Sequence, residues 1–308
     1  MSHSQAEGLI SVKDVVFELS IFAQEYGVSE KQFELGTGRK YPWEQGVPRT
    51  KRYALCPVCN NPVRLVGLYK SVKPKPYGAH VARNVPGLPA HNDHRYANCP
   101  RYVGITPINE NARYDEPEPH QLELCQVLRD NIHKIIYVAE STLDIRGTVN
   151  FWRKCIEKFV GSKGYLYPRI SIDNLPWLFL YFGANQADLY RQNVKLNSDM
   201  HRAIVSNCSN AKFEISSESA QYGALVRGDG YLDNISLRFT GYEVVSRENT
   251  AYEKMTIYVD FRDREIYKAQ LDVVPSLLRR MLRSRWDDNK RNKALQDVAT
   301  EVMAKLGL

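Results

Sequence analysis

The chain has 308 residues and an ordinary globular composition, with 43% hydrophobic and 25% charged residues. This balance excludes a wholly disordered or fibrous protein, and the length allows two domains. The longest apolar run, residues 175–182, is too short to span a bilayer, and the N-terminal residues lack the pattern of a secretory signal. We therefore expect a cytoplasmic protein of bacterial type, with no membrane partner, whose reduced cysteines bind metal rather than form disulfides.

Positive charge is concentrated in one window of the sequence. Residues 39–102 contain twelve Lys or Arg and two acidic residues, a net charge of +10, whereas the rest of the chain carries −3. A second basic cluster lies near the C-terminus, in residues 279–293. Two dense clusters in a neutral background indicate contact with an acidic partner.

The first expected element is a helix over residues 12–26, where apolar residues recur at helical spacing before Gly27. Short strands at 52–55 and 63–66 flank a turn in the cysteine-containing region. Residues 109–119 are polar, acidic and proline-bearing, which predicts a linker followed by a helix start.

The middle of the chain has helical periodicity. Apolar stripes run through residues 122–136 and 149–160, the second with Thr148 as N-cap and Gly161 as its end. Residues 174–182 are apolar all round, which predicts a core helix that ends at Gly183, and two weaker helices follow to about Ser206.

Strict alternation of apolar and polar residues then replaces the helical period. Residues 235–240, 255–261 and 267–273 predict an antiparallel meander, with a tight turn at 262–264. Helical spacing returns from Pro275 to the end of the chain.

These elements predict an α+β fold with a zinc-ribbon-like N-terminal module, a helical middle and a C-terminal antiparallel meander packed by a long helix. The expected segments are an N-terminal helix in 1–30, a basic zinc module in 31–115, a helical region in 116–210, and the meander with a basic C-terminal helix in 211–308.

The strongest local signal is the pair Cys56 and Cys59, separated by two residues. A tight turn can direct both thiolates at one zinc ion, and a closed tetrahedral site then needs two more ligands from a distant segment. Cys99 is the third candidate. His80 is our choice for the fourth, with His91 and His94 as competitors. This pattern predicts a structural zinc site, and the alternative is a pair of buried reduced cysteines with solvent-exposed histidines.

The run Cys56-Pro-Val-Cys59, followed by Tyr77-Gly-Ala-His80 and Cys99, resembles the N-terminal zinc module of CoiA-like competence proteins. It is also similar to uncharacterised bacterial proteins with a Cys-Pro-x-Cys motif. The resemblance covers about residues 52–99. In CoiA-like proteins a nuclease domain follows the module, but the expected acidic and Glu-x-Lys pattern is absent downstream here.

One catalytic alternative remains, because the histidines at 80, 91 and 94 resemble the ingredients of an HNH-like nuclease. The usual acidic neighbour of the first histidine is Ala79 here, and only one Cys-x-x-Cys pair is present. We therefore assign no catalytic residue, and we favour a binding protein over an enzyme.

The favoured function is binding of nucleic acid, DNA or RNA, by a zinc-stabilised basic module. Tyrosines at 53, 69, 77, 96 and 102 are interleaved with the basic residues and could stack on unpaired bases, or could cover a small core. A second alternative is a subunit that binds another protein through its charged surfaces. The residues expected to contact phosphate are Arg49, Lys51, Arg52, Lys70, Lys73, Lys75, Arg279, Arg280 and Arg283.

Overall fold

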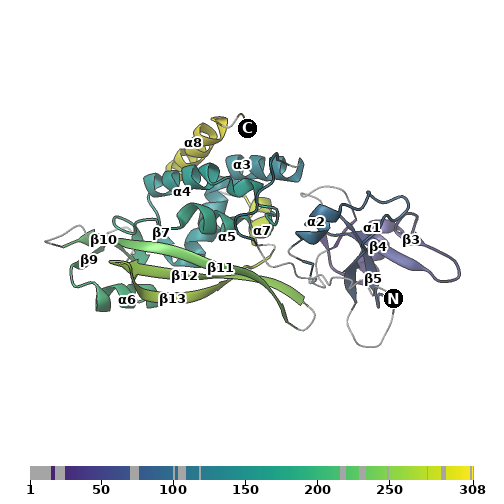
Figure 1. The fold of residues 1–308 in the computed structure, drawn as a ribbon, viewed down its shortest axis with the longest axis horizontal. Coiled ribbons are helices and arrows are strands. Elements are labelled where there is room, and N and C mark those ends of the chain that lie inside the picture. Colours follow the sequence, from purple (N-terminus) through teal and green to yellow (C-terminus); the bar gives the residue numbers. More distant parts are fainter. Residues whose placement is uncertain are drawn as a thin grey trace. The chain divides into compact units, whose positions relative to one another are not determined.

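The chain divides into two units in the computed structural model, each with sheets of its own (Figure 1). Unit 1 comprises residues 1–110 together with 243–253, and unit 2 comprises 111–242 together with 254–308. The structure describes residues 15–17, 25–69, 76–99, 101–102, 109–117, 119–215, 220–228, 234–247, 250–275, 277–285, 289–305 and 307.

Unit 1 is built from short elements around one antiparallel sheet. The strands follow the order β2-β1-β4-β5-β6, and β3 pairs with β4 outside this path. The elements are β1 (Val15–Val16), β2 (Glu25–Tyr26), α1 (Glu30–Thr37), β3 (Glu44–Gln45), β4 (Lys51–Leu55), β5 (Pro62–Val66), β6 (Tyr77–His80) and α2 (Asp93–Ala97).

The helix predicted over residues 12–26 is wrong in the part that the structure describes. Val15 and Val16 form β1, which pairs with β2 on one side and with Leu55 of β4 on the other. β-branched side chains favour extended backbone, and Val15 is fully buried in the unit 1 core. Tertiary pairing therefore outweighs the helical spacing of the apolar residues.

Unit 2 contains most of the helices. They are α3 (Pro119–Leu143), α4 (Val149–Gly161), a 3-10 turn (Gly164–Leu166), α5 (Leu175–Phe179), a π-helical turn (Leu180–Ala184), α6 (Asp199–Asn207), α7 (Leu277–Arg283) and α8 (Lys290–Ala304). Thr148 caps α4 as predicted, because its hydroxyl accepts a hydrogen bond from the Phe151 N–H at 3.2 Å.

Two more sheets belong to unit 2, apart from residues 243–253 of the second, which are part of unit 1. One has the order β7-β8-β10-β9, formed by β7 (Ile145–Arg146), β8 (Asn193–Lys195), β9 (Ala211–Ile215) and β10 (Tyr222–Arg227). The other is the predicted meander, β11 (Ile235–Arg247), β12 (Thr250–Phe261) and β13 (Arg264–Asp272). Its last turn is tight, with positive φ at Arg262 and Asp263, as a two-residue hairpin of primed type requires.

The predicted α+β class, with a helical middle and a meander packed against helices, is confirmed. The C-terminal helix differs in detail. The C-terminal segment forms two helices, α7 and α8, rather than one long helix, and α8 packs on α3 and α4 (Figure 1). The helix that packs on strand β13 of the meander is α6. No helix in the described part of the chain has the length and apolar character needed to cross a bilayer.

Arg279 of α7 lies inside unit 2 and not on its surface. Its Nε donates to Asp173 Oδ1 at 2.9 Å, and the two side chains are only 5% and 4% exposed. The expectation that Arg279 contacts phosphate is therefore wrong, because its charge is used within the fold. Its neighbours Arg280 and Arg283 are exposed.

We predict that Arg279→Ala destabilises unit 2 by about 3–5 kcal/mol, because it removes one partner of a buried ion pair with the Asp173 carboxylate. Arg280→Ala removes an equal charge from the next, exposed position and should change the free energy of unfolding by less than about 0.5 kcal/mol. Urea unfolding of both full-length variants measures the difference. Equal stability of the two variants would contradict this assignment.

Candidate metal centre

The Cys56–Cys59 turn begins directly after β4 ends. The Cys56 N–H donates to the Asn61 carbonyl at 3.0 Å, and the Asn60 N–H donates to the Cys56 carbonyl at 2.9 Å. Asn60 has a φ of 58°, in the left-handed region that Asn tolerates better than most residues. These constraints close the turn between β4 and β5 and hold both cysteines in the buried core of unit 1.

His80 reaches the same place from the neighbouring strand. It is the last residue of β6, and it pairs in register with Val63 of β5. Its ring meets the rings of Tyr96 and Tyr102 edge-on, with centroids 5.7 Å and 6.0 Å away. The sheet register and the aromatic contacts therefore fix where the imidazole lies.

Cys99 follows the short helix α2, and hydrogen bonds join the start of α2 to the residue after the cysteine turn. The Asn61 side chain, 1% exposed, accepts from the Asn92 N–H at 2.8 Å and donates to the Asn92 carbonyl at 3.2 Å. Asn92 in turn caps α2, because its side chain accepts from the Arg95 N–H at 2.8 Å. α2 ends two residues before Cys99, so the Asn61–Asn92 pair sets the position of the Cys99 ligand.

The four candidate ligands converge as a tetrahedral metal site requires. All four ligand atoms lie within 4.8 Å of one another. Cys56 Sγ is 3.7 Å from Cys99 Sγ, and Cys59 Sγ is 3.3 Å from His80 Nε2. Zinc–sulfur bonds of about 2.3 Å at tetrahedral angles place two sulfurs about 3.8 Å apart and a sulfur and a nitrogen about 3.6 Å apart. The spacing of the side chains thus fits a single ion at the centre.

The site is closed to solvent. Its four residues, Cys56, Cys59, His80 and Cys99, are between 0% and 5% exposed. A metal with four protein ligands and no access for water has no open position for a substrate. This arrangement is typical of a structural site.

The electrostatics of the cluster favour a cation at its centre. Burial opposes a charge on the His80 imidazole, but the electrostatic interactions and hydrogen bonds with the adjacent Cys59 and Cys56 outweigh it and raise the His80 pKa to about 10. Burial likewise opposes ionisation of Cys56, but hydrogen bonds from Cys59 and Cys99 and the charge of His80 lower its pKa well below the usual value. A divalent metal stabilises such thiolates directly and displaces the protons.

The structure distinguishes among the three candidate histidines. His80 belongs to the cluster. His91 instead places Nε2 3.0 Å from Asp93 Oδ1, and His94 is exposed on α2. The complete burial of His80 also argues against the HNH-like alternative, since a general base must reach its substrate.

The tyrosines serve the core more than an outer surface. Tyr53 is buried, and Tyr96 and Tyr102 pack around His80. The Tyr69 ring lies beneath the Arg52 guanidinium, 4.2 Å from its centroid. Of the two roles considered from the sequence, covering a small core is the one that these four side chains fill.

The predicted phosphate contacts of unit 1 have different environments. Arg49 and Lys51 are exposed at the hairpin that joins β3 to β4. Arg52 is ion-paired with Glu44 at 2.9 Å in addition to its contact with Tyr69. Lys70, Lys73 and Lys75 lie outside the described residues.

The comparisons with known proteins give no relative: no family model, no curated protein and no solved structure matches the chain. The resemblance to CoiA-like modules stays a prediction carried by residues 52–99.

Sequence reasoning missed the Asn61–Asn92 pair that positions Cys99. The histidines in residues 91–94 point to metal binding, whereas Asn92 before a short helix is also an N-cap signal. The partner of Asn92, 31 positions earlier, has no signature in the sequence.

We predict that the purified chain binds about one metal ion per molecule, held by the four clustered residues. His80→Ala should abolish stoichiometric binding, because three ligands leave an open coordination position. His91→Ala is the matched control and should retain the metal, since its ring faces Asp93. Elemental analysis of both variants after dialysis measures the difference, and metal retained by His80→Ala but lost from His91→Ala would reverse the ligand assignment.

Proposed function

We propose that the chain is a nucleic-acid-binding protein in which a zinc ion holds a basic hairpin rigid. The observation that carries the proposal is the position of β4. This strand of five residues begins at the exposed Lys51 of the hairpin and ends next to the ligand Cys56. A metal bound at one end of β4 therefore restrains the other end, where the charge is presented.

Zinc is the metal that best suits the ligand set. Three thiolates and one imidazole form a soft, tetrahedral donor set, and Zn²⁺ imposes no other geometry through its d electrons. The metal would act as a structural link between the cysteine turn, β6 and the segment after α2. In this role it stabilises the fold and takes no part in a reaction.

The β3–β4 hairpin has the surface of a contact site. Residues 46–50 form its loop, in which Val47 is 96% exposed and Arg49 is exposed beside it. Among the described residues neither Arg49 nor Lys51 has a carboxylate partner. Two unpaired cations next to an exposed aliphatic side chain suit a polyanion that also offers apolar surface, as nucleic acid does.

The neighbouring cations Arg39 and Arg52 are partly neutralised by an acidic residue, so they contribute less to binding a polyanion. Arg39 and Arg52 both pair with Glu44, at 3.3 Å and 2.9 Å. Exposed or half-exposed pairs of this kind are worth little in stability, but they reduce the charge available to a ligand. The contact is therefore centred on Arg49 and Lys51, and Lys70, Lys73 and Lys75 extend the same window along the sequence.

We predict that Arg49→Ala/Lys51→Ala weakens binding to single- or double-stranded DNA or RNA about tenfold. It should also lower the slope of log affinity against log salt concentration by about one to two units, because binding releases fewer counterions when fewer phosphates are contacted. Fluorescence anisotropy with labelled oligonucleotides at several salt concentrations measures both quantities.

A matched control is Lys31→Ala/Lys305→Ala, which removes two exposed cations from α1 and from the end of α8. It should leave affinity and salt dependence within twofold of the wild type. Equal loss in the two double variants would mean that only net charge matters. No salt-sensitive binding to any nucleic acid would overturn the proposal and favour a protein partner, and metal-dependent cleavage would favour the nuclease alternative.

A further inference from the structure

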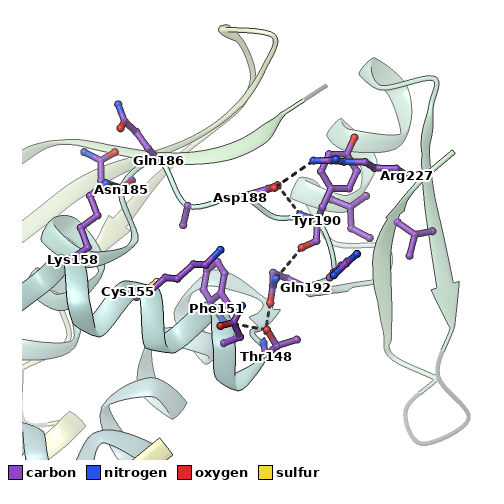
Figure 2. A pocket seen from close by; sticks show the side chains of 17 residues that line it. Thr148, Phe151, Cys155, Lys158, Asn185, Gln186, Asp188, Tyr190, Gln192 and Arg227 are labelled. Carbon is purple, nitrogen blue, oxygen red and sulfur yellow. Dashed lines mark hydrogen bonds and ion pairs between the residues drawn. The ribbon is translucent and has the colours of Figure 1, made fainter. Parts of the chain in front are cut away.

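A large pocket lies within unit 2, and its lining includes none of the residues that suggested a function from the sequence. Its volume is about 920 Å³, in the upper range of pockets that hold small molecules or cofactors. One face of α4, the segment after the π-helical turn and the end of β10 line it (Figure 2).

The lining is cationic. Among the described residues that line the pocket, the cations are Lys154, Lys158, Arg191 and Arg227, and Asp188 is the one carboxylate. The formal charge of the lining is therefore +3. Lys154 and Lys158 are one turn apart on α4, which places both on the same face of the helix.

Most of this charge is uncompensated. Lys154 and Arg191 have no carboxylate partner among the described residues, and Lys158 donates to the Asn185 carbonyl. Arg227 is 3.7 Å from Asp188, and its guanidinium stacks on the Tyr190 ring, 4.5 Å from the centroid. In Figure 2, Lys158 and Arg227 lie at opposite ends of the labelled residues, so the charges are distributed along the pocket.

Residues 185–192 form one wall of the pocket, and hydrogen bonds to neighbouring strands hold this wall in place. The Gln186 N–H donates to the Leu237 carbonyl at 2.6 Å, and the Arg191 N–H donates to the Leu225 carbonyl at 2.7 Å. Both residues have positive φ, 62° and 67°, which is uncommon for residues other than glycine. The wall is thus fixed in an unusual backbone conformation by hydrogen bonds to the surrounding sheets.

The floor depends on close packing between the π-helical turn and α4. A Cβ at Gly183 would lie 2.6 Å from the Cys155 carbonyl oxygen, so the two backbones meet where any larger residue would clash. π-helical turns inside helices are frequent at functional sites. Here the turn ends at Ala184 and directs the chain into the wall that carries Gln186 to Arg191.

We infer that this pocket binds a ligand that carries several phosphate groups, of the size of a nucleoside triphosphate. Four cations line one cavity and only Arg227 has a carboxylate beside it among the described residues, so a polyanion that extends along the pocket would neutralise them. Arginine guanidinium groups match phosphate oxygens in geometry, and lysines supply point charges beside them. The phosphates can belong to a free nucleotide or to a nucleic-acid strand.

Isothermal titration calorimetry with inorganic pyrophosphate and with ATP tests the inference on the full-length chain. We expect one site per molecule, and at least tenfold weaker binding of both probes by Lys154→Gln/Arg191→Gln. Both side chains are exposed, so the variant should unfold at the wild-type temperature. Lys31→Gln/Lys305→Gln is the charge-matched control and should bind as the wild type does.

A third probe, a short 5′-phosphorylated oligothymidylate, distinguishes the two phosphate sources. It is titrated into Arg49→Ala/Lys51→Ala, with and without the two pocket substitutions, so that the unit 1 hairpin does not contribute. If ATP binds and the oligonucleotide shows no binding that depends on the pocket residues, the ligand is a free nucleotide. If the oligonucleotide binds through the pocket residues and ATP does not bind, the ligand is a nucleic-acid strand. The inference is overturned if no probe binds, or if every bound probe binds the pocket variant and the wild type equally. Loss of hairpin binding alone would affect only the proposed function.

Discussion

The convergence of three thiols and one imidazole is the constraint on which unit 1 depends. The described strands β1 to β6 have between two and five residues and the longer helix, α1, has eight, so the apolar core around them is small. The three clustered cysteines are themselves members of that core. Small domains with limited hydrophobic burial commonly need a metal or disulfides, and metal binding then supplies folding free energy directly. A metal at this point links β4, β6 and the segment after α2.

Unit 2 is stabilised differently, by an extended apolar interior with a few buried charges. The Glu140 carboxylate accepts from the Trp152 Nε1–H and from the Gly147 N–H, both at 2.9 Å, and also pairs with Arg291. Together with the Asp173–Arg279 pair, this contact fastens the C-terminal helices α7 and α8 to the helical middle. The C-terminal basic cluster thus contains one buried anchor, Arg279, one partly exposed anchor, Arg291, and exposed cations such as Arg280.

The sequence predicted features that depend on local chemistry. The metal ligands were identifiable because a Cys-x-x-Cys turn needs partners, and the meander because alternation reports a half-buried sheet. Features set by distant contacts were not identifiable. Val15 and Val16 lie in strands because β4 is beside them, and Arg279 is buried because Asp173 faces it. The unit 2 pocket assembles cations from three segments, none of which forms a cluster in the sequence.

The most direct test of the central claim is X-ray absorption spectroscopy of the purified, metal-loaded chain at the zinc edge. We predict three sulfurs at about 2.3 Å and one nitrogen at about 2.0 Å bound directly to the zinc, with no oxygen ligand. The same measurement on Cys99→Ser should show two sulfurs, or no bound zinc. A first shell dominated by nitrogen and oxygen, or a wild-type spectrum unchanged in Cys99→Ser, would contradict the Cys56, Cys59, His80 and Cys99 site.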